Sequence, residues 1–319
     1  MQKRAAASLI FVLLAACGGS NASLVPDETP LAIDTPPPAA SGAQAGRYTL
    51  LAYRAFRANE QLAIHASFER RVETSLAADG EVQSREASAE RGQLDGTLHV
   101  ITVQEGWPVQ LELEVDKLVL DGVPATKGML VRVDGTELKI TRGPALGERA
   151  LRVLHELVEI RPEPDADRVL ATSTPRAVGE AWPVDLDALR DSFERNGTHV
   201  EPDALDASAK LLGIEHDLDF DCAKVELIAK VDPLAANEPV PANAMVRHVA
   251  ASYVRHFMLP VDPANRLQRH TIALDSRTEE LHLKASPQAP NTFPVQTTHT
   301  TTRHELTLQA PRTLPAGRR

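Results

Sequence analysis

Hydrophobic and polar residues alternate along much of this chain, which is the pattern of β-strands that bury one face and expose the other. In the clearest stretch the apolar positions share one parity: Leu62, Ile64, Ala66, Phe68, Val72 and Leu76. Arg70 is the one charged residue on that parity, and the turn dipeptide Asp79-Gly80 follows. We predict a single strand of about 50 Å, at about 3.3 Å per residue, that ends in a tight turn.

Two further alternating stretches follow in the first half of the chain. Val109 to Val115 alternates cleanly, but the apolar parity reverses at Leu118. A reversal requires a bulge or a turn, because a shift of one residue moves every side chain to the other face. Met129 to Val133 and Leu138 to Ile140 flank Asp134-Gly135, which predicts a hairpin.

From Leu146 onwards the apolar residues recur with the period of a helix and no longer with that of a strand. The apolar face of a first helix comprises Leu146, Ala150, Val153, Leu154, Leu157 and Val158. Pro144 lies at its start and Pro162 beyond its end. Asp185 is suited to cap a second helix that ends at Gly197. Its predicted buried residues are Leu186, Leu189 and Phe193.

Strand patterns return in the last third of the chain. One parity carries His216, Leu218, Phe220 and Cys222, and the other carries Glu215, Asp217, Asp219 and Asp221. The apolar parity reverses at Ala223, which predicts a long hairpin with its turn near Asp221. Residues 245–259 fit either a helix or a strand, and the neighbouring turn residues favour a strand. Strands at 271–275, 281–285 and 295–308 complete the set.

These elements predict an α+β fold, mainly antiparallel β, with long curved sheets and about two helices in the middle of the chain. We expect a first β region at 47–143, a helical segment at 144–197 and a second β region at 198–312, all in one globular unit, 47–312. The heptapeptides 105–111 and 180–186 resemble each other and contain Trp107 and Trp182, both tryptophans of the chain. Duplication of a β unit and coincidence are both open explanations.

The N-terminus has a different pattern. Residues 1–4 include Lys3 and Arg4, and an uncharged, mostly apolar run from Ala5 to Ala16 follows. That run is shorter than the about 20 residues that span a bilayer, and its order of charge, apolar core and small residues is typical of a secretory signal. Leu14-Ala15-Ala16-Cys17 resembles the lipobox of bacterial lipoproteins. The resemblance implies that 1–16 is a cleaved signal peptide and that Cys17 carries a diacylglycerol on its sulfur.

Residues 17–46 predict a flexible connection between that lipid and the folded part. The segment is rich in Pro, Ala, Ser and Gly and has little apolar pattern, so we expect a disordered tether. The resemblance also implies that the partner of the N-terminus is a membrane and that the location is the bacterial cell envelope. Gly18 follows the cysteine, which in enteric bacteria would imply the outer membrane, facing the periplasm or the cell surface. Two or more acyl chains hold a protein on a membrane stably.

Charge narrows the range of partners. The chain has 34 basic and 44 acidic residues, a net charge of -10. Loss of Lys3 and Arg4 with the signal would make it -10 - 2 = -12. An acidic chain argues against nucleic acid as a partner.

Candidate chemistry is sparse. His155 and Glu159 resemble half of a helical zinc motif without its second histidine, and His299 and His304 are an odd number apart, so they face opposite sides of a strand. His216 and Cys222 share a parity and could bind zinc, but a core histidine and a buried thiol are the favoured interpretation. The acidic residues Glu215, Asp217, Asp219 and Asp221 could bind calcium, although a solvated face paired with Lys224 is favoured. We assign no catalytic residue, no metal ligand and no cofactor.

Long amphipathic strands with a few helices in a lipoprotein resemble the half-barrel carriers of the LolA and LolB type. Gly179-Glu180-Ala181-Trp182 also resembles a step found in many envelope lipoproteins. These resemblances imply non-enzymatic binding of a lipid, another hydrophobic ligand or a partner protein. A structural or assembly component of the envelope and a metal-dependent enzyme on the His-rich C-terminal strands are the alternatives. A cavity lined by Leu62, Ile64, Phe68, Leu218 and Phe220 would favour carriage, and a filled core would favour scaffolding.

Overall fold

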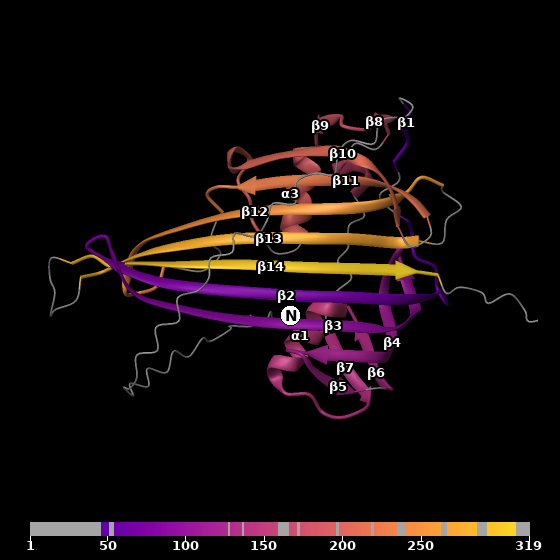
Figure 1. The fold of residues 1–319 in the computed structure, drawn as a ribbon, viewed down its shortest axis with the longest axis horizontal. Helices are drawn as coiled ribbons and strands as arrows, with labels where there is room; N and C mark the ends of the chain where they lie inside the picture. The colour runs from indigo at the N-terminus through magenta and orange to yellow at the C-terminus, as the bar shows by residue number, and fades with distance from the viewer. Residues whose placement is uncertain are drawn as a thin grey trace, which may run out of the picture. The chain divides into compact units, whose positions relative to one another are not determined.

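The computed structural model describes residues 46–310, except for 51–53, 127, 136, 159–165, 171–172, 196–197, 218–219, 235–239, 263–266 and 286–291. Within these residues the fold is α+β and mainly antiparallel β, as predicted, and one long, curved, open sheet dominates it (Figure 1). The strands follow one another across the sheet in the order β7 (Glu137–Arg142), β6 (Met129–Asp134), β4 (Trp107–Leu120), β3 (Glu81–Gln104), β2 (Gln61–Ala78), β14 (Val295–Gln309), β13 (Leu267–Leu283), β12 (Ala244–Pro260), β11 (Phe220–Val231), β10 (Leu205–Asp217) and β9 (Ala181–Pro183).

The remaining elements are short. β5 (Val123–Thr126) pairs with β4, and β1 (Arg47–Tyr48) pairs with β8 (Arg176–Ala177) in a separate two-stranded sheet. The helices are α1 (Glu148–Val158), α2 (Ala166–Val169), α3 (Leu186–Arg195) and a 3-10 turn at Pro202–Ala204.

The middle of the large sheet joins the two ends of the described chain. β2 and β14 lie side by side there, from Val295 opposite Ala77 to Gln309 opposite Ala63 (Figure 1). β2 and its hairpin partner β3 therefore continue one half of the sheet, while β14 and β13 continue the other.

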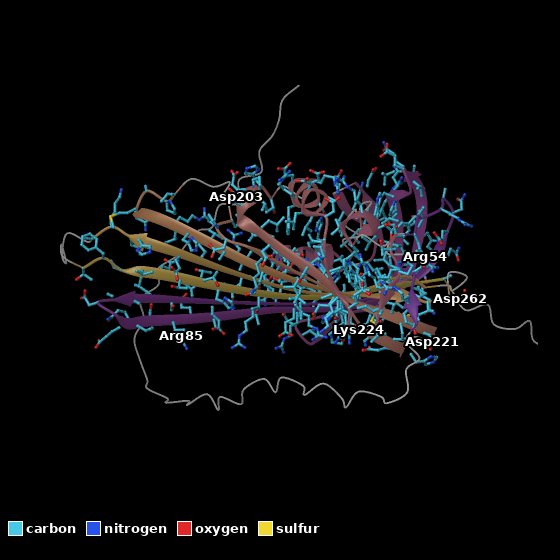
Figure 2. The ribbon with its side chains drawn as sticks, turned by 90° about the horizontal axis from the view of Figure 1, so that it is seen from above. Arg54, Arg85, Asp203, Asp221, Lys224 and Asp262 are labelled. Atoms are coloured by element: carbon cyan, nitrogen blue, oxygen red, sulfur yellow. The ribbon has the colours of Figure 1, made fainter. Side chains whose placement is uncertain are left out.

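Two apolar cores lie on the same face of this sheet. The first packs α1 against β2, β3, β4, β6 and β14, and the second packs α2 and α3 against β9 to β12. Paired residues point to the same face, and one row runs from Phe68 in the first core through His304, Ala273 and Arg255 to Leu227 in the second. The helices accordingly lie on one side of the strands, which we call the helix-bearing face (Figure 2).

Both predicted helices are present. α1 buries Val153, Leu154, Leu157 and Val158, as predicted. Asp185 caps α3 as predicted: its Oδ1 accepts a hydrogen bond of 2.9 Å from the backbone N of Ala188. Leu189 is buried and Phe193 packs against the second core, but Leu186 is 41% exposed, so its prediction was wrong. Leu186 is the first residue of α3, where solvent reaches the side chain. Pro162 and Gly197 lie outside the described residues.

The strand predictions of the first half are confirmed. β2 ends at Asp79-Gly80, where both residues have positive φ. The parity reversal before Leu118 is a bulge, since Lys117 faces Asp95 and Val115 faces Gly96. β6 and β7 form the hairpin predicted around Asp134-Gly135.

Two strand predictions of the second half need correction. The predicted β10–β11 hairpin is present, but its turn lies between Asp217 and Phe220, which face each other, and so comes slightly before Asp221. The predicted strands 271–275 and 281–285 are parts of the single strand β13. The polar residues between them belong to the strand as well, but they bury too little apolar surface to show the alternation. Residues 245–259 form a strand, β12, as favoured.

Candidate functional site

A groove of about 470 Å³ runs along the helix-bearing face beside the two cores. Its lining comes from four adjacent strands: Arg70 and Val72 of β2, Thr300 and Thr302 of β14, Asp275, Ser276, Arg277 and Glu279 of β13, and Arg247, Ala251 and Tyr253 of β12. These strands are the centre of the sheet, where the two halves of the chain meet (Figure 1). The groove is therefore a feature that only long-range strand pairing creates.

The groove exists because the helix-bearing face changes from apolar to polar along the strands. β2 is buried up to Phe68 and β14 is buried at Leu306 and Leu308. One row beyond Phe68, Arg70 faces Thr302 on the neighbouring strand. These polar side chains do not pack as a core, so the face stays open there.

Arg70 fixes the end of α1 beside the groove. Its Nη2 donates a hydrogen bond of 2.8 Å to Oε1 of Glu156, and its Nη1 lies 3.8 Å from Glu90. Glu90 also accepts a 2.7 Å bond from Arg152, and this bond raises the pKa of the Arg152 guanidinium. The single charged residue on the apolar parity of β2 thus serves to position a helix.

A second ion pair lies on the neighbouring strands. Asp275 pairs with Arg255 through both carboxylate oxygens, and the Nη2–Oδ2 distance is 3.0 Å. Tyr253, two residues before Arg255, lines the groove and also contacts Phe193 of α3, with ring centroids 4.9 Å apart. This aromatic pair connects the groove to the second core.

Two arginines of the groove share one carboxylate. Nε of Arg247 lies 2.6 Å from Oε1 of Glu279, and Nη2 of Arg277 lies 3.7 Å from Oε2 of the same residue. The Arg247 side chain is 6% exposed and that of Arg277 is 47% exposed. Arg277 is therefore the groove cation that solvent, or a ligand, reaches most easily.

His216 and Cys222, the pair considered as an alternative zinc site, do not come together. His216 faces Asp221 across the β10–β11 hairpin, and its Nδ1 lies 3.1 Å from Oδ1 of that residue. Cys222 is the next residue along β11, so it points to the opposite face and is fully buried. The buried thiol is confirmed, whereas His216 is exposed and is not a core residue, because the turn comes earlier than predicted.

Cys222 has charged neighbours. Burial lowers the pKa of the Arg54 guanidinium, while Asp262 and Cys222 act in the opposite direction. Arg54, Asp262 and Asp221 lie at the same end of the strands (Figure 2). This group lies away from the groove, which Arg70 and Arg277 line near the middle of β2 and β13.

The acidic residues considered as calcium ligands are not all on one strand. Glu215 and Asp217 belong to β10, and Asp221 belongs to β11 beyond the turn. Nζ of Lys224 donates a 3.0 Å bond to Glu215, which confirms the predicted basic neighbour. Asp219 lies outside the described residues.

Other candidate residues are separated. His299 faces Glu73 and His304 faces Phe68, so the two histidines point to opposite faces as predicted. His155 is half-buried on α1, while Glu159 and Cys17 lie outside the described residues. Among the residues that the structure describes, no group of three His, Cys, Asp or Glu side chains is arranged to hold a metal ion. No helix in this part of the chain is long and apolar enough to cross a membrane.

Each tryptophan of the repeated heptapeptide packs against a different core. Trp107 contacts Phe56 beside the first core, and Nε1 of Trp182 donates a 2.7 Å bond to the carbonyl of Leu170 in the second. The first copy continues as β4, whereas the second leads into α3. The likeness of the two copies therefore does not extend to the structure that follows them.

The cavity expected for a carrier is not formed by the described apolar residues. Leu62, Ile64 and Phe68 are buried in the first core against α1. The side chains of Leu218 and Phe220 lie outside the described set. The groove residues of β13 were missed, and Arg70 on an apolar parity was the one sequence signal that pointed to a polar site.

Comparisons with known proteins do not identify a family for this chain. No family model and no curated protein matches the chain. One solved structure, entitled "Lipid-protein interactions in lipovitellin", aligns with a TM-score of 0.32 and 10% identity, covering 83% of this chain and 26% of that one. The chain thus spans about a quarter of the length of that protein. A likeness at this TM-score carries no argument about function.

Proposed function

We propose that this chain is a non-enzymatic binding protein, anchored to a bacterial cell envelope by lipid on Cys17, which binds its ligand in the groove. The anchoring part rests on the resemblance of Leu14-Ala15-Ala16-Cys17 to a lipobox. The proposed location is the outer membrane, facing the periplasm or the cell surface. The tether of residues 17–46 would let the sheet reach a ligand at some distance from the bilayer.

The groove is the observation that carries the binding part of the proposal. Its volume of about 470 Å³ lies within the range of about 300–1,000 Å³ that is usual for small-molecule sites. Its lining combines apolar surface from Val72, Ala251 and Tyr253 with charged groups, which is the composition that orients a ligand. The carboxylates Asp275 and Glu279 are both held in ion pairs with arginines of β12, so the site is better suited to binding than to proton transfer.

A structural role in the envelope is the second candidate, and a specific observation favours it. The residues whose cavity would indicate carriage, Leu62, Ile64 and Phe68, are packed in a filled core. A structural role requires the folded sheet and its two cores, but it does not require an open groove. A variant that fills the groove therefore separates the two functions.

Thr300→Tyr is such a variant. Thr300 lines the groove, and an aromatic side chain is well accommodated in a strand. Thr301→Tyr on the opposite face of β14 is the matched control, since both threonines are half-buried. Mass spectrometry of the purified chain should find a co-purifying small molecule with the wild type and Thr301→Tyr but not with Thr300→Tyr. Equal retention by all three, or by none, would favour the scaffold.

Anchoring has its own test. Radiolabelled palmitate should enter the wild-type chain and the Cys222→Ser variant, because Cys222 is buried in the sheet. It should not enter Cys17→Ser. Equal labelling of Cys17→Ser would refute the lipid anchor while leaving the groove untouched.

A further inference from the structure

The charges of the groove do not balance. Three of its lining residues are arginines, Arg70, Arg247 and Arg277, and two are acidic, Asp275 and Glu279, so the lining carries a net charge of 3 - 2 = +1. Four of these five charges are held in close ion pairs, and Arg277 is the exception. Arg70 pairs with Glu156, and Asp275 pairs with Arg255.

Arg277 is the lining arginine whose printed ion pair is the loosest. Arg247 and Arg277 both lie near the carboxylate of Glu279. Arg247 holds it at 2.6 Å and is nearly buried, whereas Arg277 lies 3.7 Å from it and is 47% exposed. A guanidinium stays charged at all ordinary pH values and presents a planar set of donors that matches the oxygens of a phosphate or a carboxylate.

Apolar surface lies beside this cation. Ala251 is paired with Arg277 across β12 and β13, and Val72 is reached from Arg277 through Thr300 in the same row. Tyr253 lies one row further along the same face. A molecule with an anionic group at Arg277 would therefore place its apolar part over Ala251, Val72 and Tyr253.

From this placement we infer that the groove binds a small amphiphile that carries one anionic group, and that Arg277 binds that group. The inference rests on the proposed function, since it names the ligand class of the same groove. A lipid-like phosphate and inorganic phosphate carry the same kind of anionic group, but only the lipid-like molecule has an apolar part.

Titration of dodecyl phosphate, below its micelle concentration, into the full chain carrying Cys17→Ser tests this inference. We expect Arg277→Gln to weaken binding by roughly tenfold or more, because a charge-assisted hydrogen-bonded pair is lost. Arg277→Lys should recover part of the loss, since it restores the charge without the planar donors. Arg303→Gln is the matched control: Arg303 is 54% exposed and lies 3.7 Å from Glu305, but it is on the opposite face. It should leave the affinity unchanged.

The other probes separate the possible failures. Inorganic phosphate should bind more weakly than dodecyl phosphate, and binding as tight as that of the amphiphile would overturn the apolar part of the inference. Dodecyl maltoside is uncharged, and equal affinity for it, with no effect of Arg277→Gln, would overturn the anionic part. If Thr300→Tyr abolished the binding of dodecyl maltoside in that case, the proposed function would stand and the inference of an anionic ligand would fail. If Thr300→Tyr changed no binding at all, both would fail.

Discussion

Gly96 lies where the bulge of β4 brings two backbones close together. A Cβ at this position would lie 2.4 Å from the carbonyl oxygen of Glu114, which is backbone and cannot move aside cheaply. Glycine is therefore required here by space and not by an unusual φ. The register shift between Asp95 and Gly96 absorbs the extra residue of β4.

We predict that Gly96→Ala lowers the free energy of unfolding by about 1–3 kcal/mol, the usual cost of overpacking. Gly213→Ala is the control, because a Cβ there would meet no atom within 4 Å. Urea denaturation of both variants measures the difference. Equal stability of the two would show that the backbones are not packed as closely as the structure has them.

Glu180 joins β1, β8 and the turn before β9. Its carboxylate accepts a 3.0 Å bond from the backbone N of Ala177, a 3.0 Å bond from Arg176 and a 3.2 Å bond from Arg47. The bond from Ala177 is the largest cause of a lowered pKa of Glu180, and Arg176 adds to it. The folded state thus holds the ionised form more firmly than the unfolded chain does.

This lowered pKa predicts the direction of a pH effect. The contribution of Glu180 is fully present above the ordinary glutamate pKa of about 4.3 and is lost as the pH falls through the lower folded-state value. Glu180→Gln should therefore reduce the loss of stability on acidification, and Glu137→Gln on the exposed edge strand β7 should not. Thermal unfolding across this pH range is the measurement, and parallel curves for wild type and Glu180→Gln would contradict the prediction.

At the level of elements, α3 depends on its first turn. Oδ1 of Asp185 accepts a bond from the backbone N of Ala188, and Oδ2 accepts a 3.0 Å bond from Nε of Arg168 in α2. The bond from Ala188 is also the main cause of the lowered pKa of Asp185. One carboxylate caps α3 and ties it to the neighbouring helix.

We predict that Asp185→Ala destabilises the chain by about 1 kcal/mol, the typical value of an N-cap. Asp187→Ala in the same turn is the control, because that side chain is 72% exposed and makes only a surface pair with Arg190. Its effect should be no more than a few tenths of a kcal/mol, as for other surface pairs. Urea denaturation that ranks the two variants equally would contradict the capping role.

The elements that the sequence predicts best are those that pack against a helix. β2 up to Phe68, β4 and β6 alternate apolar and polar residues because one face lies in the first core. β3 was not predicted at all, and its residues 81–89 are exposed and need no apolar parity. β13 was divided in two for the same reason, and its polar middle is the part that lines the groove.

At the level of the whole described fold, the groove could not be predicted from the sequence, because it depends on which strands pair with one another. Arg70 and Asp275 are about 200 positions apart in the chain, yet they lie in one row because β2 pairs with β14 and β14 with β13. Local patterns show which residues share one face of a strand, but they do not show which strands pair with it. Arg70 alone could be recognised as unusual, and the residues it meets could not.

The same topology separates two ways of binding a ligand. If the groove is the site, both cores stay filled and the ligand contacts only β2 and β12 to β14. If the protein were a carrier that opens a core, α1 or α3 would have to leave the sheet and expose residues such as Leu157 or Leu189.

Hydrogen–deuterium exchange of the full chain, with and without dodecyl phosphate, distinguishes these two modes most directly. We predict that the ligand slows exchange in β12, β13 and β14 around Ala251, Arg277 and Thr300, and leaves α1 and α3 unchanged. Faster exchange in either helix on binding, with no protection around Arg277, would contradict a groove that binds its ligand between filled cores.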